Sequence, residues 1–113
     1  MDLKSLTQLG RVEQEVEIAP DFKFKIHTLS VGEQQKALLS ISQEITDETA
    51  KLLQLQKAVL VYATDSINGE VIEKDKLQSL YTEVQPVILS KLFESYVTLS
   101  DTQGKVLEEL KKK

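Results

Sequence analysis

His27 and two pairs of neighbouring acids are the residues of this chain whose types could do chemistry. A histidine can act as a general base or ligate a metal, and paired carboxylates can hydrolyse glycosides or hold a divalent cation. His27 is the only histidine, and no carboxylates cluster beside it in the sequence. Because it falls in an expected strand, the sequence predicts a surface position for His27, with a general base as the alternative.

The two acid pairs are Asp47 with Glu48, and Glu73 with Asp75. Each pair stands where a helix is expected to begin, and acidic side chains are stabilised at a helix N-terminus by the helix dipole. We therefore interpret both pairs as helix-capping residues rather than as catalytic acids or metal ligands.

The chain lacks the motifs that usually anchor catalysis or a cofactor. It contains no G-x-S-x-G, Walker, H-E-x-x-H or G-x-G-x-x-G pattern, and no cysteine for a disulfide or a thiolate metal site. The sequence therefore predicts no cofactor, no metal and no enzymatic activity. A deep pocket that joins His27 to two carboxylates from distant segments would revive an enzymatic interpretation.

Charge and hydropathy limit the class of partner. Acidic residues outnumber basic ones by 18 to 14, and the net charge of −4 would repel a nucleic-acid backbone. The basic cluster at 111–113 lies at an expected helix end, where cations are favoured. No segment approaches the roughly 18 apolar residues of a membrane span, and residues 1–10 lack the pattern of a signal peptide. We expect a cytoplasmic protein that binds neither nucleic acid nor membrane.

Two segments near the start, 12–18 and 22–27, alternate polar and apolar residues as strands do. Ala19-Pro20-Asp21 between them should form the connecting turn. The glutamates of the first strand are expected to lie opposite the lysines of the second on the outer face. The apolar face of this hairpin must then be covered by helices.

Helical spacing follows the hairpin. Ser30 and Glu33 have the spacing of a capping box, which predicts a helix that begins at Val31 and extends to Ile45. Its apolar positions are Ala37, Leu38, Ile41 and Ile45.

A second helix should be capped by Thr46 or Asp47 and run to about Tyr62. It is apolar around much of its girth toward the end, which predicts a buried position. The segment 58–63 could instead be a strand, because it is rich in β-branched residues. Asn68-Gly69 then predicts a tight turn or a miniature hairpin.

Two more helices are expected. One begins at Asp75 and ends near Gln85, because Pro86 disfavours helical geometry in the residue before it. Pro86 suits the first position of the last helix, which should hold 88–99 and can continue to Leu110. Gly104 could kink or stop this helix.

These elements predict a single α+β domain, in which an N-terminal β-hairpin (12–28) packs on a helical body (31–113) of about four α-helices. The length of 113 residues, with 41% hydrophobic and 28% charged residues, suits one globular domain. Residues 1–11 are expected to form a flexible or partner-docking N-terminal arm. Alternatively, Leu3, Leu6 and Leu9 could pack on the domain.

The exposed side of the last helix is the predicted binding surface. The valines of this helix lie outside its main apolar stripe and widen its apolar surface. A helix of another protein could therefore dock in a groove beside it. The alternative is a wide band that faces the core. We expect Leu92→Asp or Phe93→Asp to abolish folding or binding, and His27→Ala to leave both intact. The predicted partner-binding residues are Val87, Leu92, Phe93, Tyr96, Val97 and Val106.

Three passages of the sequence resemble the small tail assembly chaperones of tailed bacteriophages and the related baseplate-hub assembly proteins of contractile phages. They are FKFKIHTLSVGEQ at 22–34, SINGE at 66–70, and PVILSKLFESYVTL at 86–99. With the segments between them, they cover about residues 20–110. The N-terminal arm and the first strand match this pattern poorly, so the resemblance assigns them no role.

The resemblance implies a non-enzymatic chaperone or baseplate assembly factor in the cytoplasm of a bacterial host. Its partner would be the long helical tape measure protein, whose apolar stripes it would keep from aggregating while tail-tube subunits gather. An exposed apolar groove beside the last helix should distinguish this function. The alternatives are a structural component of the tail or baseplate, whose hairpin edge pairs with its neighbours, and a small inhibitor that binds a host protein. Homo-oligomerisation is also open.

Overall fold

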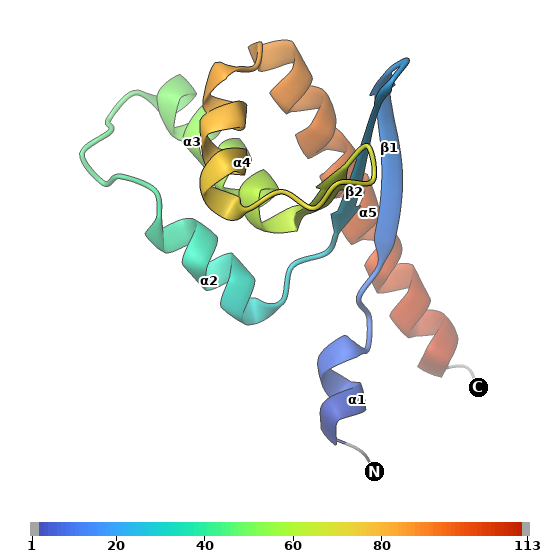
Figure 1. The fold of residues 1–113 in the computed structure, drawn as a ribbon. Coiled ribbons are helices and arrows are strands. Elements are labelled where there is room, and N and C mark those ends of the chain that lie inside the picture. Colours follow the sequence, from blue (N-terminus) through green and yellow to red (C-terminus); the bar gives the residue numbers. More distant parts are fainter. Residues whose placement is uncertain (1–2, 112–113) are drawn as a thin grey trace.

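The computed structural model describes residues 3–111, apart from the side chains of residues 106, 107 and 109–111. It confirms the α+β class, with an N-terminal hairpin followed by helices (Figure 1). The elements are α1 (Leu3–Gln8), β1 (Glu13–Ala19), β2 (Phe22–His27), α2 (Val31–Leu39), α3 (Glu48–Ala63), β3 (Thr64–Ile67), α4 (Lys74–Glu83) and α5 (Pro86–Lys111).

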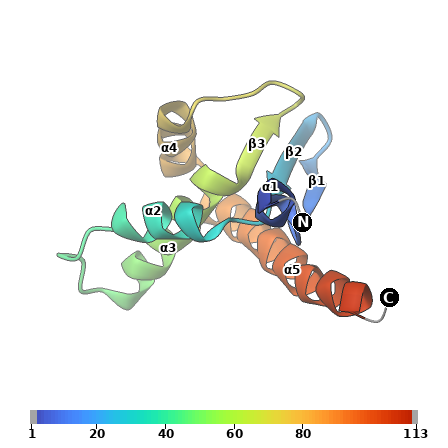
Figure 2. The same cartoon turned by 90° about the horizontal axis from the view of Figure 1, so that it is seen from below.

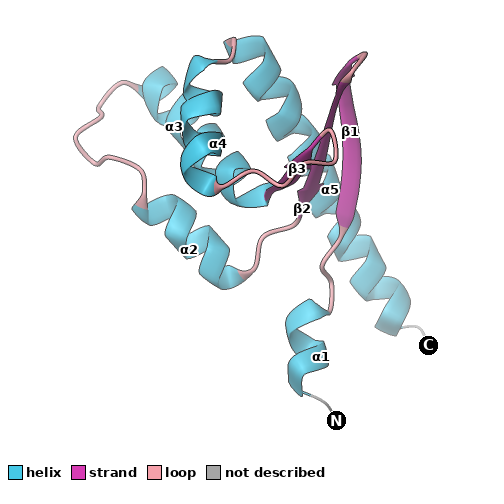
Figure 3. Ribbon diagram, in the orientation of Figure 1, coloured by secondary structure: helices cyan, strands magenta, loops and turns pink. Residues whose placement is uncertain are grey.

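The predicted hairpin is part of a three-stranded antiparallel sheet of order β1-β2-β3 (Figure 3). Glu15 pairs with Lys25 and Glu17 with Lys23, so the predicted glutamate and lysine rows do face each other. Asp21 in the turn has a φ of 74°, a left-handed conformation that aspartate tolerates better than most residues.

The third strand is a finding that the sequence did not predict. β3 has the sequence Thr-Asp-Ser-Ile, which lacks the alternation of a strand, and it becomes one by pairing with β2. The turn predicted after it is confirmed, since Asn68 and Gly69 have φ values of 54° and 80° and Ile67 bridges to Glu70. The backbone N–H of Lys23 donates to the Asn68 side chain at 2.8 Å, so this turn also fixes β2.

The first predicted helix begins as expected and ends early. Ser30 and Glu33 form the complete capping box at the start of α2. The predicted extension to Ile45 is wrong, because α2 ends at Leu39. The Ser40 hydroxyl donates to the carbonyl of Ala37 at 2.7 Å, and the chain continues as a loop.

The remaining helices follow the prediction closely. Asp47 caps α3 by accepting the N–H of Thr49 at 2.9 Å, and segment 58–63 is helical rather than a strand. α5 begins at Pro86 and continues past Gly104, which does not stop it. In the part of the chain that the structure describes, no helix is both long and apolar enough to cross a membrane.

The core lies between one face of the sheet and the helices. α5 runs along β1 and β2, and α3 contacts α2, α4 and α5 (Figure 2). Four large side chains from four different elements are fully buried: Ile26, Leu60, Leu77 and Leu92. Burial of a side chain of this size contributes roughly 1.5–3 kcal/mol, so the layers are held together mainly by aliphatic packing.

Candidate functional site

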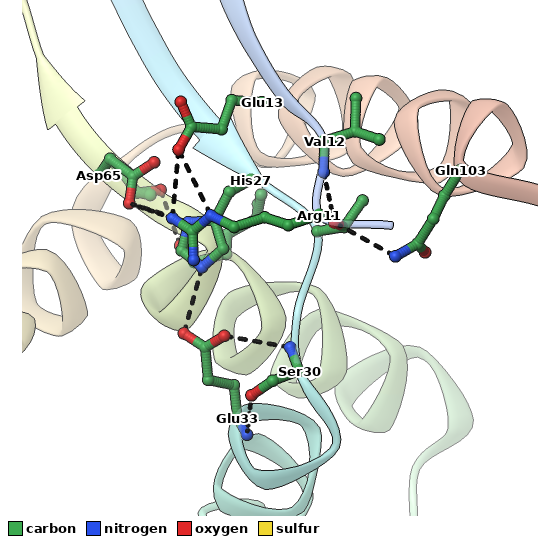
Figure 4. Close-up of polar contacts among 11 residues, drawn as sticks. Arg11, Val12, Glu13, His27, Ser30, Glu33, Asp65 and Gln103 are labelled. Carbon is green, nitrogen blue, oxygen red and sulfur yellow. Dashed lines mark hydrogen bonds and ion pairs between the residues drawn. The ribbon is translucent and has the colours of Figure 1, made fainter. Parts of the chain in front are cut away.

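His27 lies in the most highly charged cluster of the described chain, and the predicted surface position is wrong. Its side chain is only 5% exposed, at the end of β2 on the sheet face opposite the core. The Nδ1 atom lies 2.8 Å from Oδ1 of Asp65, and Nε2 lies 3.1 Å from Oε2 of Glu33 (Figure 4). Two carboxylates from distant segments therefore flank the histidine.

A bulge in β3 and the capping box of α2 place the two carboxylates beside His27. Lys25 pairs with Ser66 and Ile26 with Thr64, so Asp65 is the extra residue of a bulge in β3. A bulge redirects a side chain, and here it brings Asp65 to the histidine ring. Glu33 accepts the backbone N–H of Ser30 with one oxygen, as the capping box requires, and contacts His27 with the other.

Arg11 extends the cluster to the N-terminal arm. Its guanidinium lies 3.3 Å from Glu13 and 3.8 Å from Asp65, and Lys25 lies 3.4 Å from the other oxygen of Glu13. Lys25, with a smaller contribution from Arg11, lowers the pKa of Glu13. Partial burial opposes a similar shift at Glu33, but the backbone N–H of Ser30 and the His27 ring outweigh it and lower the pKa of that carboxyl.

The geometry of His27 is that of a structural link between elements. Both ring nitrogens face protein carboxylates, so neither is directed toward a substrate. The Nδ1 contact is short but poorly aligned for a hydrogen bond, and Oδ2 of Asp65 is buried with no hydrogen-bond partner. The two groups therefore lie in close contact without the geometry of a hydrogen bond.

The conditions for an enzymatic interpretation are met only in part. Two carboxylates from distant segments do reach His27, but the small cleft of about 70 Å³ nearby is lined by Arg11 and Glu33 and not by the histidine. No group of three or more histidine or acidic side chains in the described residues could hold a metal ion.

The two acid pairs lie at helix starts, as predicted. Asp47 caps α3, and Glu48 is in its first turn. Glu73 occupies the N-cap position of α4 without a side-chain hydrogen bond to it, and Asp75 is in the first turn. Their positions are those of residues that stabilise helix ends.

Three of the predicted partner-binding residues lie in or against the core. Leu92 is fully buried, Tyr96 is buried, and Phe93 is half-buried with its ring 6.2 Å from that of Tyr96. The alternative of a core-facing band therefore holds for these residues, and in this structure Leu92 and Tyr96 are not accessible to a partner.

Val87 and Val97 are the exposed members of the predicted set, at 59% and 43%. They are separated along α5 by polar exposed residues such as Lys91 and Glu94, so they form no continuous apolar stripe. Binding through Val87 and Val97 stays a prediction. The side chain of Val106 lies outside the described residues.

A groove does lie beside α5, at the start of the helix. It has a volume of about 250 Å³ between α3 and the α4–α5 junction. Its apolar lining includes Leu53, Val84, Pro86 and Leu89, and none of the six predicted residues contributes to it.

A row of exposed apolar residues lies on α1 and in the turn directly after it. Leu3, Leu6 and Leu9 are 71%, 58% and 55% exposed, so they do not pack on the domain. The arm is nevertheless anchored where it joins the body, since Gln103 of α5 donates to the carbonyl of Gly10 at 2.8 Å. α1 therefore projects from a fixed point (Figure 1), and none of its residues is buried.

The fold and these surfaces define a small α+β domain with a cluster of partly exposed charged side chains around a buried histidine, and an arm with exposed leucines. Comparison with protein-family models, curated proteins and solved structures finds no match to this chain.

Proposed function

We propose that this chain is a non-enzymatic protein-binding domain that acts as a tail assembly chaperone or baseplate assembly factor of a tailed phage. The observation that carries the proposal is the row of Leu3 and Leu6 on α1 and Leu9 in the turn directly after it, all more than half exposed. Residues three apart lie on one side of a helix, and isolated helices this short are unstable in water. An apolar partner would cover the leucines and stabilise α1.

The charged cluster supports a role without catalysis. His27 is buried, and its two ring nitrogens face Asp65 and Glu33. A general base must reach the proton that it abstracts, and this ring is enclosed by side chains of the domain itself. The cluster joins β2, β3, α2 and the arm, and so holds the chain just after the C-terminal end of α1 in a fixed place.

The proposed partner is an apolar helical protein such as the tape measure protein, bound in the host cytoplasm. Its apolar stripe would lie along the leucines of α1, with Val87 and Val97 of α5 as further candidate contacts. Burial of such a stripe keeps it from aggregating, and the net charge of −4 keeps the complex dispersed. A small contact area suits a chaperone that assembly must displace.

Co-expression with the tape measure protein of the same genome tests this proposal. We expect the tape measure protein to become soluble and to co-purify with the wild-type chain. The variant Leu3→Ser/Leu6→Ser/Leu9→Ser should lose this effect and keep its circular dichroism spectrum. The matched control is Leu38→Ser/Leu39→Ser, which removes two exposed leucines of α2 and should act as wild type. Equal solubilisation by the α1 variant would contradict the proposal.

A structural component of the tail or baseplate is the second candidate. The observation that favours it is that β1 is an edge strand of the sheet, which can pair with a strand of another structural protein of the particle. Mass spectrometry of purified virions distinguishes the two, because a chaperone leaves the particle and a structural component remains at constant copy number.

A further inference from the structure

β1 presents unpaired backbone groups along one side. Among the residues that the structure describes, it pairs with β2 alone, and it forms the outer edge of the sheet (Figure 3). Alternate residues of an antiparallel strand direct their N–H and C=O groups toward and away from the partner strand. The carbonyl of Val12 accepts the N–H of Thr28 from the β2 side, so Gln14 and Val16 also face β2. The backbone groups of Glu13, Glu15 and Glu17 therefore point outward.

The same three residues place a row of carboxylates along this edge. Glu13 is paired with Arg11 and Lys25, whereas Glu15 and Glu17 form no ion pair with the residues that the structure describes. Both side chains are exposed. An added strand would set its own residues directly opposite these glutamates on the same face, where opposite charges stabilise the pairing.

A groove lies on the other face of the edge, between β1 and α5. It has a volume of about 360 Å³, and Val16 and Ile18 of β1 form its apolar side, with Glu17 at its rim between them. Lys91, Glu94 and Thr98 of α5 line the opposite side. Residues of an added strand that alternate with the basic ones would point into this groove and could cover the two apolar side chains.

We propose that the edge of β1 binds an extended segment of another protein in which lysine or arginine alternates with apolar residues. The segment adds to the sheet as a fourth strand through the outward backbone groups of β1, and its cations pair with Glu15 and Glu17. β2 already shows the matching pattern, since Lys23 and Lys25 lie opposite the same two glutamates from the other side.

Charge excludes a second copy of β1 as the occupant. Suppose that two copies of β1 pair in antiparallel orientation through their outer edges, so that the two sheets form one continuous sheet. Glutamates then lie opposite glutamates, for example Glu15 of one copy opposite Glu17 of the other. Like charges in directly opposed positions destabilise a strand pair. The edge is thus protected against self-association and remains available to a basic strand.

Peptide binding tests this inference independently of α1. The probe is a seven-residue peptide with blocked ends that alternates lysine with valine, titrated against the full chain at low salt. We expect binding by calorimetry, and chemical-shift changes and added exchange protection at the amides of Glu15 and Glu17. The Leu3→Ser/Leu6→Ser/Leu9→Ser variant should bind this peptide as the wild type does. A failure of the proposed chaperone function, which depends on these leucines, can therefore be told apart from a failure of peptide binding at β1.

Two controls separate strand addition from simple charge attraction. A peptide of the same composition with its lysines grouped together, and an alternating peptide with N-methylated backbone amides, should each bind at least tenfold more weakly. The variant Glu15→Gln/Glu17→Gln should also lose at least tenfold in affinity. Glutamine is chosen over lysine because a lysine at position 15 or 17 would lie opposite Lys25 or Lys23 and would destabilise the hairpin. Glu83→Gln on α4 is the matched control and should leave affinity unchanged.

The outcomes decide the inference in both directions. Loss of binding in the glutamine variant and in the N-methylated peptide, with retained thermal stability of the protein, supports it. Absence of binding to the wild-type chain at low salt overturns it. Equal affinity for the alternating and grouped peptides also overturns it, because it would show attraction to charge without pairing.

Discussion

His27 and Asp65 connect two strands that are separated in the chain by α2 and α3, with 2.8 Å between Nδ1 and Oδ1. The second oxygen of Asp65 is buried with no hydrogen-bond partner. The Asp65 carboxylate therefore relies on His27, with more distant support from Arg11, to offset the cost of its partial burial. His27 should therefore contribute to stability. The sequence alone predicts the opposite, that His27→Ala leaves folding and binding intact.

We predict that His27→Ala lowers the free energy of unfolding by about 1–3 kcal/mol, because it leaves two partly buried carboxylates without their partner. Urea denaturation followed by circular dichroism measures this loss. Lys23→Ala, an exposed change on the same strand, is the control and should stay within about 0.5 kcal/mol of wild type. An unchanged midpoint for His27→Ala would show that the ion pairs contribute nothing.

A double-mutant cycle isolates the contact itself. If His27 and Asp65 interact as the geometry indicates, Asp65→Ala should cost much less in the His27→Ala background than in the wild type, with a coupling energy of at least about 0.5 kcal/mol. Additive effects of the two substitutions would show that His27 stabilises the protein independently of Asp65, through its contact with Glu33 or through packing.

Acid should destabilise the protein in part through Glu33. The pKa of Glu33 lies below its ordinary value of 4.5 in the folded chain. A depressed folded pKa adds stability that is present above the unfolded value and is lost as the pH falls through the folded pKa. We predict that Glu33→Gln is less stable than wild type at neutral pH and that this difference shrinks below pH 4.5. A difference that is constant with pH would contradict the prediction.

Tyr81 should make the protein sensitive to alkali. Burial raises the pKa of Tyr81 to about 12 against an ordinary value of 10, although the hydrogen bond with Thr64 opposes this shift. The hydroxyl oxygens of Tyr81 and Thr64 lie 2.7 Å apart. Because the unfolded chain ionises first, stability should fall as the pH rises from about 10 to 12. Tyr81→Phe should remove this component of the loss, as measured by urea midpoints across that range.

Two residues predicted to bind a partner should differ sharply in their effect on stability. Leu92 is fully buried, and Leu92→Ala should cost about 2–5 kcal/mol through lost burial and a cavity. Val97 is 43% exposed, and Val97→Ala should change stability by less than about 0.5 kcal/mol. Thermal denaturation of the two variants checks this. Comparable losses would mean that the outer side of α5 is covered.

Local patterns predicted the elements whose signals are contained within a few residues. The alternation in 12–18 and 22–27, the capping box of Ser30 with Glu33, and the turn at Asn68-Gly69 each depend on neighbours in the chain, and the structure confirms them. Pro86 set the start of the last helix for the same reason. Apolar spacing placed the end of α2 too late. Ile41 and Ile45 have the spacing of helical residues and are half-buried, but they lie in the loop after α2.

Only the tertiary structure decided the strand β3, the burial of His27 and the division of α5 into core and surface positions. Thr64–Ile67 is polar and short, and it is a strand because β2 supplies its hydrogen-bond partners. His27 is buried because a bulge in β3 and a helix cap bring carboxylates to it from distant segments. Hydrophobic periodicity shows which side of a helix is apolar, but which of those residues a neighbouring element covers depends on packing between segments far apart in the chain.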